Sequence, residues 1–159
     1  MEEEGLRLPA CLALKLALIV FALTACSTPR IVILNDPLTA GEHVDLGLAY
    51  EHKGLLDLAE KEYLKAVAIQ DTWAVPYFNL GNVAYCQKNL KKAETYYRRA
   101  LKLDQQNPDI MNNLASLLHE IGRNDEAMVL IDKALVIQPK AEYQDTKLKI
   151  EGPQVQQQP

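Results

Sequence analysis

The hydrophobic residues between positions 40 and 151 recur at the spacing of α-helices. Leu46, Ala49 and Tyr50 are an example, because residues three and four apart lie on one face of a helix. The pattern is interrupted at Gly54, Asn89 and residues 122–124. No segment shows the alternation of apolar and polar residues that is typical of a strand. The sequence therefore predicts an all-α domain built from short helices.

Polar residues and prolines mark where several of these helices begin. Thr39 followed by Glu42 forms a capping box, in which each side chain accepts a hydrogen bond from the backbone N–H of the other residue. Asn107 is an N-cap, and Pro108 occupies the first helical position, where its missing N–H costs little. Pro76 likewise falls within the first turn of a predicted helix.

The same pattern occurs three times with a period of 34 residues, in segments 40–73, 74–107 and 108–141. Glycine or alanine stands at positions 8, 20 and 27 of each segment, and large apolar residues stand at positions 7 and 24. Small residues let two antiparallel helices approach closely, and the large residues fill the gaps. In the order 7, 8, 20, 24 and 27, these residues are Leu46, Gly47, Ala59, Tyr63 and Ala66; Leu80, Gly81, Ala93, Tyr97 and Ala100; and Leu114, Ala115, Ala127, Ile131 and Ala134.

Over residues 40–141 this pattern resembles the tetratricopeptide repeat (TPR) family. The resemblance implies an all-α solenoid of three helix-turn-helix repeats, each an antiparallel helix pair. A helix pair buries its apolar face only against its neighbours, so the ends of the stack need covers. We expect residues 142–151 to form a C-terminal capping helix and the Gln-rich residues 152–159 to be disordered. The apolar residues of the expected cap are Tyr143, Leu148 and Ile150.

The N-terminal segment has the features of a signal peptide. Residues 16–23 are uncharged and apolar, follow Lys15 and lead into small residues. A run of this length suits the core of a cleaved signal peptide and is short for a membrane-spanning helix. Residues 23–26, Leu-Thr-Ala-Cys, resemble the bacterial lipobox, in which the cysteine is acylated and the peptide before it is removed.

This resemblance implies a signal peptide over residues 1–25, a lipid on Cys26 and a lipid-anchored linker over residues 26–39. Ser27 resembles the sorting pattern of lipoproteins sent to the outer membrane of Gram-negative cells, with the domain on its periplasmic face. The acidic residues 2–4 depart from the basic start of a signal peptide. Two alternatives remain open, an uncleaved transmembrane anchor and a short buried helix.

Composition narrows the choice of partner. The chain has 159 residues and a formal net charge of −4, with 24% charged and 48% hydrophobic residues, which indicates one modest globular domain. No run of Lys and Arg is dense enough to attract phosphates, so nucleic acid is not an expected partner. Of the three cysteines, Cys11 leaves with the signal peptide and Cys26 is acylated, so Cys86 has no partner for an intrachain disulfide.

The TPR resemblance implies that the first helix of each repeat lines a concave groove that holds an extended peptide or a partner helix. No Lys or Arg stands at the groove positions, so a clamp for a C-terminal carboxylate is not expected. Asparagine amides donate to and accept from a peptide backbone, which favours an extended neutral or basic segment. The alternative is that these amides bind only water. The candidate binding residues are Val44, Asp45, Leu48, Phe78, Asn79, Asn82, Tyr85, Asn112, Asn113, Ser116 and His119.

We expect no metal, cofactor or small-molecule substrate. His52, Cys86 and His119 fall on the same inner ridge, but ridge positions in adjacent repeats are about 10 Å apart, whereas zinc needs every ligand within about 2.3 Å. Cys86 is therefore expected to be a buried or half-buried apolar residue. No nucleophile motif or phosphate-binding glycine loop occurs, so the chain is not expected to be an enzyme.

The expected function is that of a membrane-anchored scaffold or adaptor that recruits a protein partner, as in small TPR lipoproteins that assist the assembly of envelope complexes. An alternative is an accessory subunit of an enzyme. Residues 35–39, followed by His43, Leu46 and Tyr50, resemble the TPR portion attached to some bacterial C39-like cysteine peptidases. A third possibility is self-association.

Self-association is suggested by the second helix of the third repeat. Val129 and Val136 are seven residues apart, on one stripe of that helix, where the second repeat has Thr95 and Lys102. We expect the C-terminal cap to cover this stripe, because the cap is tethered and its closure entropy is small. A second copy of the chain and the partner are the other candidates, and isolated exposed valines are also normal.

Overall fold

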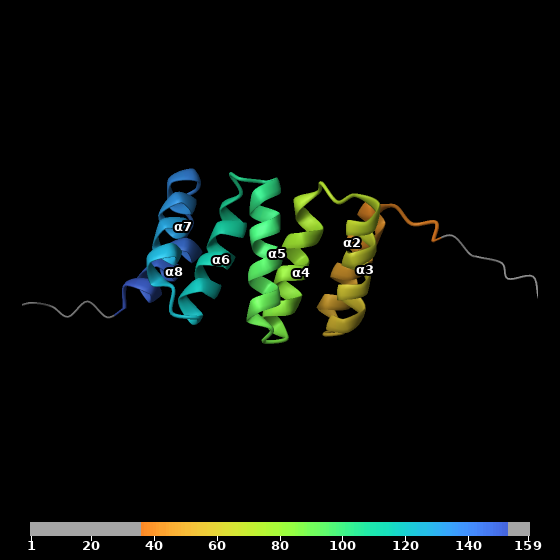
Figure 1. Cartoon of the computed structure of the whole chain (residues 1–159), viewed down its shortest axis with the longest axis horizontal. Coiled ribbons are helices and arrows are strands. Elements are labelled where there is room, and N and C mark those ends of the chain that lie inside the picture. Colours follow the sequence, from red (N-terminus) through yellow and green to blue (C-terminus); the bar gives the residue numbers. More distant parts are fainter. Residues whose placement is uncertain (1–35, 153–159) are drawn as a thin grey trace, which may run out of the picture. The chain divides into compact units, whose positions relative to one another are not determined.

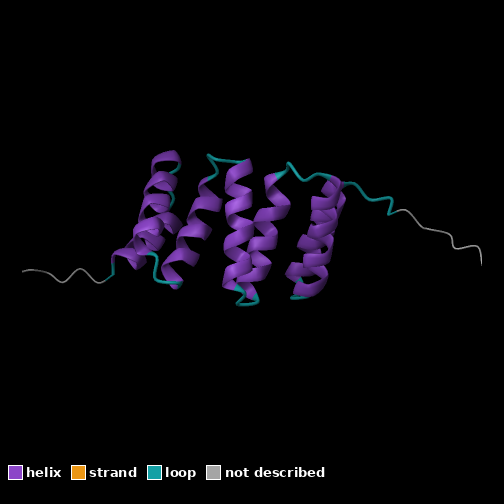
Figure 2. Ribbon diagram, viewed as in Figure 1, coloured by secondary structure: helices purple, strands orange, loops and turns teal. Residues whose placement is uncertain are grey.

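The computed structural model describes residues 36–152. Seven helices lie in this range, and the starts of the first six follow the 34-residue register (Figures 1 and 2). The helices belong to one unit that begins at Pro37, and no strand occurs among residues 36–152. The predicted signal peptide (residues 1–25), Cys26 and residues 153–159 of the predicted tail lie outside the described residues. The helices are α2 (Ala40–His52), α3 (Leu56–Ile69), α4 (Ala74–Cys86), α5 (Leu90–Leu103), α6 (Pro108–Glu120), α7 (Asn124–Ile137) and α8 (Ala141–Glu151).

The helices pair in chain order, and the pairs stack side by side. α2 packs on α3, α4 on α5 and α6 on α7, while α3 contacts α4 and α5 contacts α6 (Figure 1). The first helix of each pair has 13 residues and the second has 14, and the first helices begin at residues 40, 74 and 108. The predicted solenoid of three repeats and its register are confirmed.

The predicted caps fix the starts of α2 and α6. Thr39 Oγ1 accepts from the backbone N–H of Glu42 at 3.3 Å, and the Glu42 carboxylate accepts from the Thr39 N–H at 2.8 Å. Asn107 Oδ1 accepts from the N–H groups of Asp109 and Ile110, at 3.1 and 3.2 Å. These bonds satisfy donors that the first turn of a helix leaves unpaired, so both capping predictions are confirmed.

The turn inside each repeat needs one residue with a left-handed backbone. Gly54 has φ of 72° and Gly122 has φ of 82°, a conformation that glycine adopts without steric cost. The second repeat places Lys88 at the same position with φ of 60°. The turn geometry is therefore the same in all three repeats, and in the second repeat a lysine takes the conformation that elsewhere falls to glycine.

The small residues lie where the helices of a pair meet. A Cβ atom on Gly47 would lie 2.4 Å from Tyr63 Cε1, and one on Gly81 would lie 2.4 Å from Tyr97 Cδ1. The third repeat has the smaller Ile131 together with Ala115, and both residues are fully buried. Each tyrosine ring therefore occupies the space that a glycine leaves, as expected if small residues let the helices approach and large residues fill the gaps.

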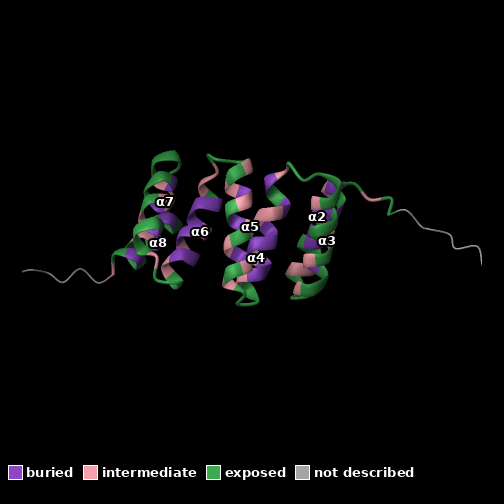
Figure 3. Ribbon diagram, viewed as in Figure 1, coloured by how far each residue is buried: buried purple, intermediate pink, exposed green. Residues whose placement is uncertain are grey.

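The core runs through the stack, and α4 and α6 are its most buried helices (Figure 3). α8 forms at the predicted place and packs on α6 and α7. Tyr143 is fully buried and Ile150 is 6% exposed in the same apolar cluster as Leu114 and Ile131. The predicted capping helix is confirmed. Leu148, the third apolar residue expected in the cap, faces outward and is 59% exposed.

The prediction that the cap covers the valine stripe is wrong. Val129 is 54% exposed and Val136 is 86% exposed in the presence of α8. Each valine lies two residues from a core residue of α7, Ile131 or Ala134, and two residues correspond to about 200° around a helix. The stripe therefore faces away from the core, whereas α8 packs on the side of α7 that adjoins α6.

Every helix within residues 36–152 is too short or too polar to span a bilayer.

Candidate functional site

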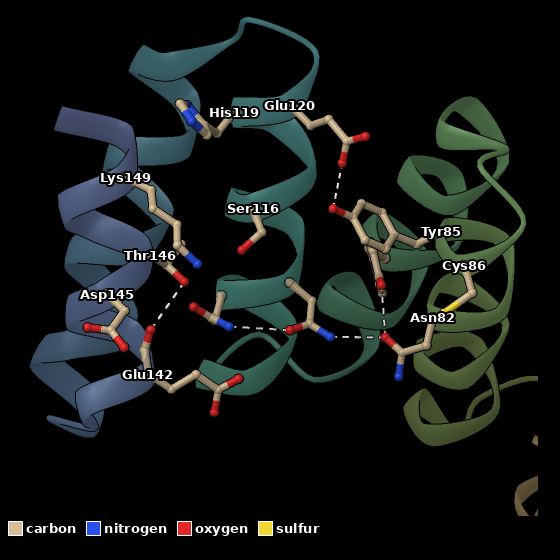
Figure 4. Close-up of a pocket in the computed structure, with 13 residues that line it drawn as sticks. Asn82, Tyr85, Cys86, Ser116, His119, Glu120, Glu142, Asp145, Thr146 and Lys149 are labelled. Carbon is tan, nitrogen blue, oxygen red and sulfur yellow. Dashed lines mark hydrogen bonds between the residues drawn. The ribbon is translucent and has the colours of Figure 1, made fainter. Parts of the chain in front are cut away.

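A pocket of about 730 Å³ lies between α4, α6 and α8. Asn82, Tyr85 and Cys86 of α4 face the α8 side chains across the pocket, and α6 lies between them (Figure 4). A volume of this size can hold several residues of an extended peptide. The lining residues are Asn82, Tyr85, Cys86, Tyr97, Asn112, Asn113, Ser116, His119, Glu120, Glu142, Asp145, Thr146 and Lys149.

A hydrogen-bonded chain of side chains crosses the pocket. The Tyr97 hydroxyl donates to Asn82 Oδ1 at 2.8 Å, and Asn113 Nδ2 donates to the same oxygen at 2.9 Å. Asn112 Nδ2 then donates to Asn113 Oδ1 at 3.3 Å. The three amides are thus oriented by one another and by a core tyrosine, so they are fixed before any ligand binds.

Asn112 is the last residue of this hydrogen-bonded series, and its Oδ1 atom has no hydrogen-bond donor within residues 36–152. The residue is only 4% exposed, and its Oδ1 accepts no hydrogen bond from residues 36–152. A buried carbonyl oxygen without a donor costs about 1 to 3 kcal/mol. This oxygen is therefore a place where a donor from a ligand would be stabilising.

An ion pair between Glu120 and Lys88 lies at the α4–α6 side of the pocket. Tyr85 donates its hydroxyl proton to Glu120, whose other oxygen is 3.4 Å from Lys88 Nζ. The hydrogen bond to Glu120, together with partial burial, raises the pKa of Tyr85 to about 12. The same bond lowers the pKa of Glu120, so this carboxylate stays ionised at neutral pH.

The wall formed by α8 carries further charge. Glu142 and Asp145 are exposed carboxylates that form no ion pair with any residue of the part that the structure describes. Lys149, one turn after Asp145, is the basic residue among the lining residues and is also exposed. The wall is therefore polar and mixed in charge, with two carboxylates and one ammonium group.

Six of the eleven predicted binding residues line this pocket. They are Asn82, Tyr85, Asn112, Asn113, Ser116 and His119. His119 also bonds Asn124 Oδ1 through its Nδ1 atom at 2.8 Å. The repeat register therefore brings together the predicted residues of the second and third repeats.

The other five predicted residues do not line the pocket. Val44 is 4% exposed and Asn79 is 7% exposed, because both side chains pack into the interior of the stack. Phe78 packs against Tyr97 with ring centroids 6.0 Å apart. Asp45 and Leu48 are exposed on α2, outside the pocket. Val44 and Asn79 are thus almost fully buried, which their repeat positions did not reveal, and a role for them in binding stays a prediction.

Sequence reasoning missed the contribution of α8 and that of Tyr97. Thr146 follows Asn112 by 34 residues, so extending the repeat register by one helix would have placed α8 along the groove. Cys86 was expected to be buried or half-buried and is exposed, because it is the last residue of α4. Within residues 36–152, no three His, Cys, Asp or Glu side chains are grouped as metal ligands.

Comparison with known proteins agrees with this architecture. Two tetratricopeptide repeat models match the chain, one over residues 42–106 and one over residues 85–150. Human tetratricopeptide repeat protein 6 is 30% identical over 69 residues, which are 43% of this chain and 13% of that protein. The type IV pilus assembly protein PilF of Pseudomonas aeruginosa is 32% identical over 85 residues, 54% of this chain and 34% of PilF. The chain thus spans about a third or less of the length of these relatives.

A solved structure with the same fold is the first TPR domain of Spaghetti (RPAP3), bound to the HSP90 peptide SRMEEVD. It superposes with a TM-score of 0.68 at 19% identity and covers 70% of this chain and 90% of its own. The matched family models, the 34-residue register and this likeness agree on one conclusion. The chain belongs to the tetratricopeptide repeat family.

Proposed function

We propose that this protein is a membrane-anchored scaffold of the bacterial cell envelope, which binds a segment of a partner protein in the pocket between α4, α6 and α8. The TPR fold supports a role in protein–protein interaction. The observation that carries the proposal is the chain of oriented amides from Asn82 to Asn112, which crosses the floor of an open pocket. Amides that are already fixed lose little entropy when they bond a peptide backbone.

The membrane anchor is proposed from the lipobox-like residues 23–26, which lie outside the described residues. A lipid on Cys26 would hold the TPR domain at a membrane, and Ser27 favours the periplasmic face of the outer membrane. The likeness to PilF, which is named for the assembly of type IV pili, supports a role in assembling an envelope complex. We propose binding rather than catalysis as the activity.

The charge of the pocket indicates which segment binds. RPAP3 is bound to SRMEEVD, a peptide with two glutamates and an aspartate. The pocket of this chain is lined by three carboxylates and one lysine, so an acidic segment would be repelled. We propose an extended neutral or basic segment.

Acylation of Cys26 is the first testable consequence. The full-length protein, produced in a Gram-negative host fed with labelled palmitate, is expected to lose its signal peptide and to carry the label. The Cys26→Ala variant should be neither labelled nor recovered with membranes. Unlabelled wild-type protein, or a variant that fractionates with membranes as the wild type does, would contradict the anchor.

Contact between the groove and a partner is tested by a photoreactive amino acid in place of Ser116. This half-buried residue of α6 lines the pocket, so irradiation of cells should yield an adduct with one or a few proteins. Adding Tyr85→Ala should reduce the adduct at least about fivefold, since it removes an aromatic wall and leaves Glu120 without its hydroxyl partner.

The matched control replaces Lys133, an exposed residue of α7 that does not line the pocket, with the same photoreactive amino acid. This control should give no adduct. Circular dichroism should show the same helical content for all variants at the temperature of irradiation. Adducts from position 133 but none from position 116 would show that the partner binds outside the pocket, on the face of the stack that carries Lys133.

A further inference from the structure

We infer that α8 adds to the groove a subsite for a lysine or arginine side chain of the bound segment, formed by Asn112, Glu142 and Asp145. The inference rests on the proposed function and specifies the chemistry of the partner. It uses residues of α8 that lie beyond the three repeats, so the subsite belongs to the C-terminal end of the pocket (Figure 4).

Glu142 and Asp145 have no ion-pair partner within residues 36–152. Several carboxylates of this stack are ion-paired: Glu94 and Glu126 with Arg98 and Arg123, and Asp132 with Lys147. Glu142 and Asp145 form no ion pair within residues 36–152, although both line the pocket. They are three residues apart in one helix, so they lie on the same face and leave an unneutralised charge there.

The buried oxygen of Asn112 is an independent observation that points to the same ligand. Asn112 lines the pocket, is 4% exposed, and has an Oδ1 atom without a donor. Lysine and arginine bring several N–H donors and no acceptor, so one group can bond this oxygen and also neutralise a carboxylate. A neutral glutamine could supply the donor but not the charge, and a glutamate supplies neither.

Lys149 limits the strength of the subsite. It lines the pocket one helical turn after Asp145, yet it is not within ion-pair distance of that carboxylate. Its charge opposes a basic ligand. Replacing it should therefore tighten binding, the opposite of what replacing the carboxylates should do, and this difference in sign separates a charge effect from a general loss of structure.

The test uses the full-length protein in non-ionic detergent at low salt. The probes are four pools of fluorescent nonapeptides, acetylated and amidated at their ends, with lysine, arginine, glutamine or glutamate fixed at the centre. Fluorescence polarisation should give a dissociation constant about tenfold or more lower for the lysine or arginine pool than for the glutamine pool, and weaker binding still for the glutamate pool.

The second part of the experiment uses variants of the α8 residues that line the pocket. Glu142→Gln and Asp145→Asn should each weaken binding of the basic pool about three- to tenfold, and Lys149→Gln should tighten it about two- to fivefold. Asp71→Asn is the matched control, since Asp71 is an exposed carboxylate in the turn between α3 and α4 and does not line the pocket. It should leave the constant unchanged.

The outcomes separate this inference from the proposed function. Equal binding of the lysine, arginine and glutamine pools overturns the inference, as does unchanged affinity in both carboxylate variants or the absence of binding to any pool. If the photoreactive residue at position 116 still captures a partner in those cases, the scaffold function stands without the basic subsite. If position 116 captures nothing either, both proposals fall.

Discussion

A chain that ends at Pro139, and so lacks α8, is expected to lose about 3 kcal/mol of its free energy of unfolding. Full burial of a large apolar side chain contributes about 1.5 to 3 kcal/mol, and α8 buries Tyr143 completely and Ile150 almost completely. The ordering entropy of the helix offsets part of this gain. The Tyr143 hydroxyl also donates to Asp109, which Lys140 contacts at 2.8 Å. For a domain of this size the melting temperature should fall by about 10 °C or more.

Thermal unfolding followed by circular dichroism measures the effect. The control is a chain that ends at Gly152, which keeps α8 whole and should melt as the full chain does. Tyr143→Ala in the full chain should reproduce most of the loss, since removing a buried aromatic ring costs about 3 to 5 kcal/mol. A truncated chain with an unchanged melting temperature would show that the stack needs no C-terminal cover.

Removing α8 should also uncover apolar surface on α6 and α7. Leu114, Leu118 and Ile131 are fully buried in the same cluster as Tyr143, and part of this surface becomes accessible without α8. Newly exposed apolar patches favour association. Sedimentation at several protein concentrations is therefore expected to show self-association of the truncated chain and not of the chain that ends at Gly152.

The repeat register made most of the fold predictable. Positions 8 and 24 are a local contact rule, because the two residues lie in neighbouring helices joined by a short turn, so Gly81 and Tyr97 can be matched from the sequence. The caps at Thr39 and Asn107 are local as well. Such local contacts can be predicted without knowing how helices far apart in the sequence pack.

The site was less predictable because it depends on contacts between elements. The wall formed by Glu142 and Asp145 exists only because α8 packs on α6 and α7, and the sequence of α8 alone does not specify this. The prediction for the valine stripe failed for another reason. A cover for Val136 was expected because the cap is tethered nearby, but the alternative of exposed valines holds, and such residues are common in folded proteins.

The contacts among the asparagines could not be predicted from their repeat positions. Asn82, Asn112 and Asn113 form hydrogen bonds with one another or with Tyr97, and all three also line the pocket in which we propose that a peptide binds. Each of these amides therefore contributes to the packing of the helices and also lines the pocket. A substitution here affects stability as well as binding, which is why Ser116 and Tyr85 are the better sites for a binding test.

A single added methyl group is expected to have a large effect at Gly81. The Cβ of an alanine would lie 2.4 Å from Tyr97 Cδ1 and 2.5 Å from Cε1, and Tyr97 is 2% exposed, so the ring has no free space into which to move. Overpacking of this kind costs about 1 to 3 kcal/mol or more, against a gain of about 1 kcal/mol from replacing glycine by alanine in a helix. We expect Gly81→Ala to lower the free energy of unfolding by about 2 kcal/mol in urea titration.

The third repeat shows which second substitution should relieve the clash. It has Ala115 with Ile131, so Gly81→Ala combined with Tyr97→Ile rebuilds a pair that the chain already uses. Tyr97→Ile alone should destabilise, because it leaves a cavity beside Gly81 and removes the hydroxyl bond to Asn82. The double variant should be more stable than the sum of the single effects predicts by about 1 kcal/mol or more.

Gly41→Ala is the matched control, since a Cβ there would meet only Thr39 Oγ1, at 3.9 Å. This variant should be as stable as the wild type or slightly more stable, because it gains helix propensity without a clash. If Gly81→Ala behaves like Gly41→Ala, or if the double variant loses the full sum of both single losses, then the close approach of the two helices does not depend on glycine at position 8. In that case the fit of the tyrosine ring against the glycine would not be what sets the spacing within each pair.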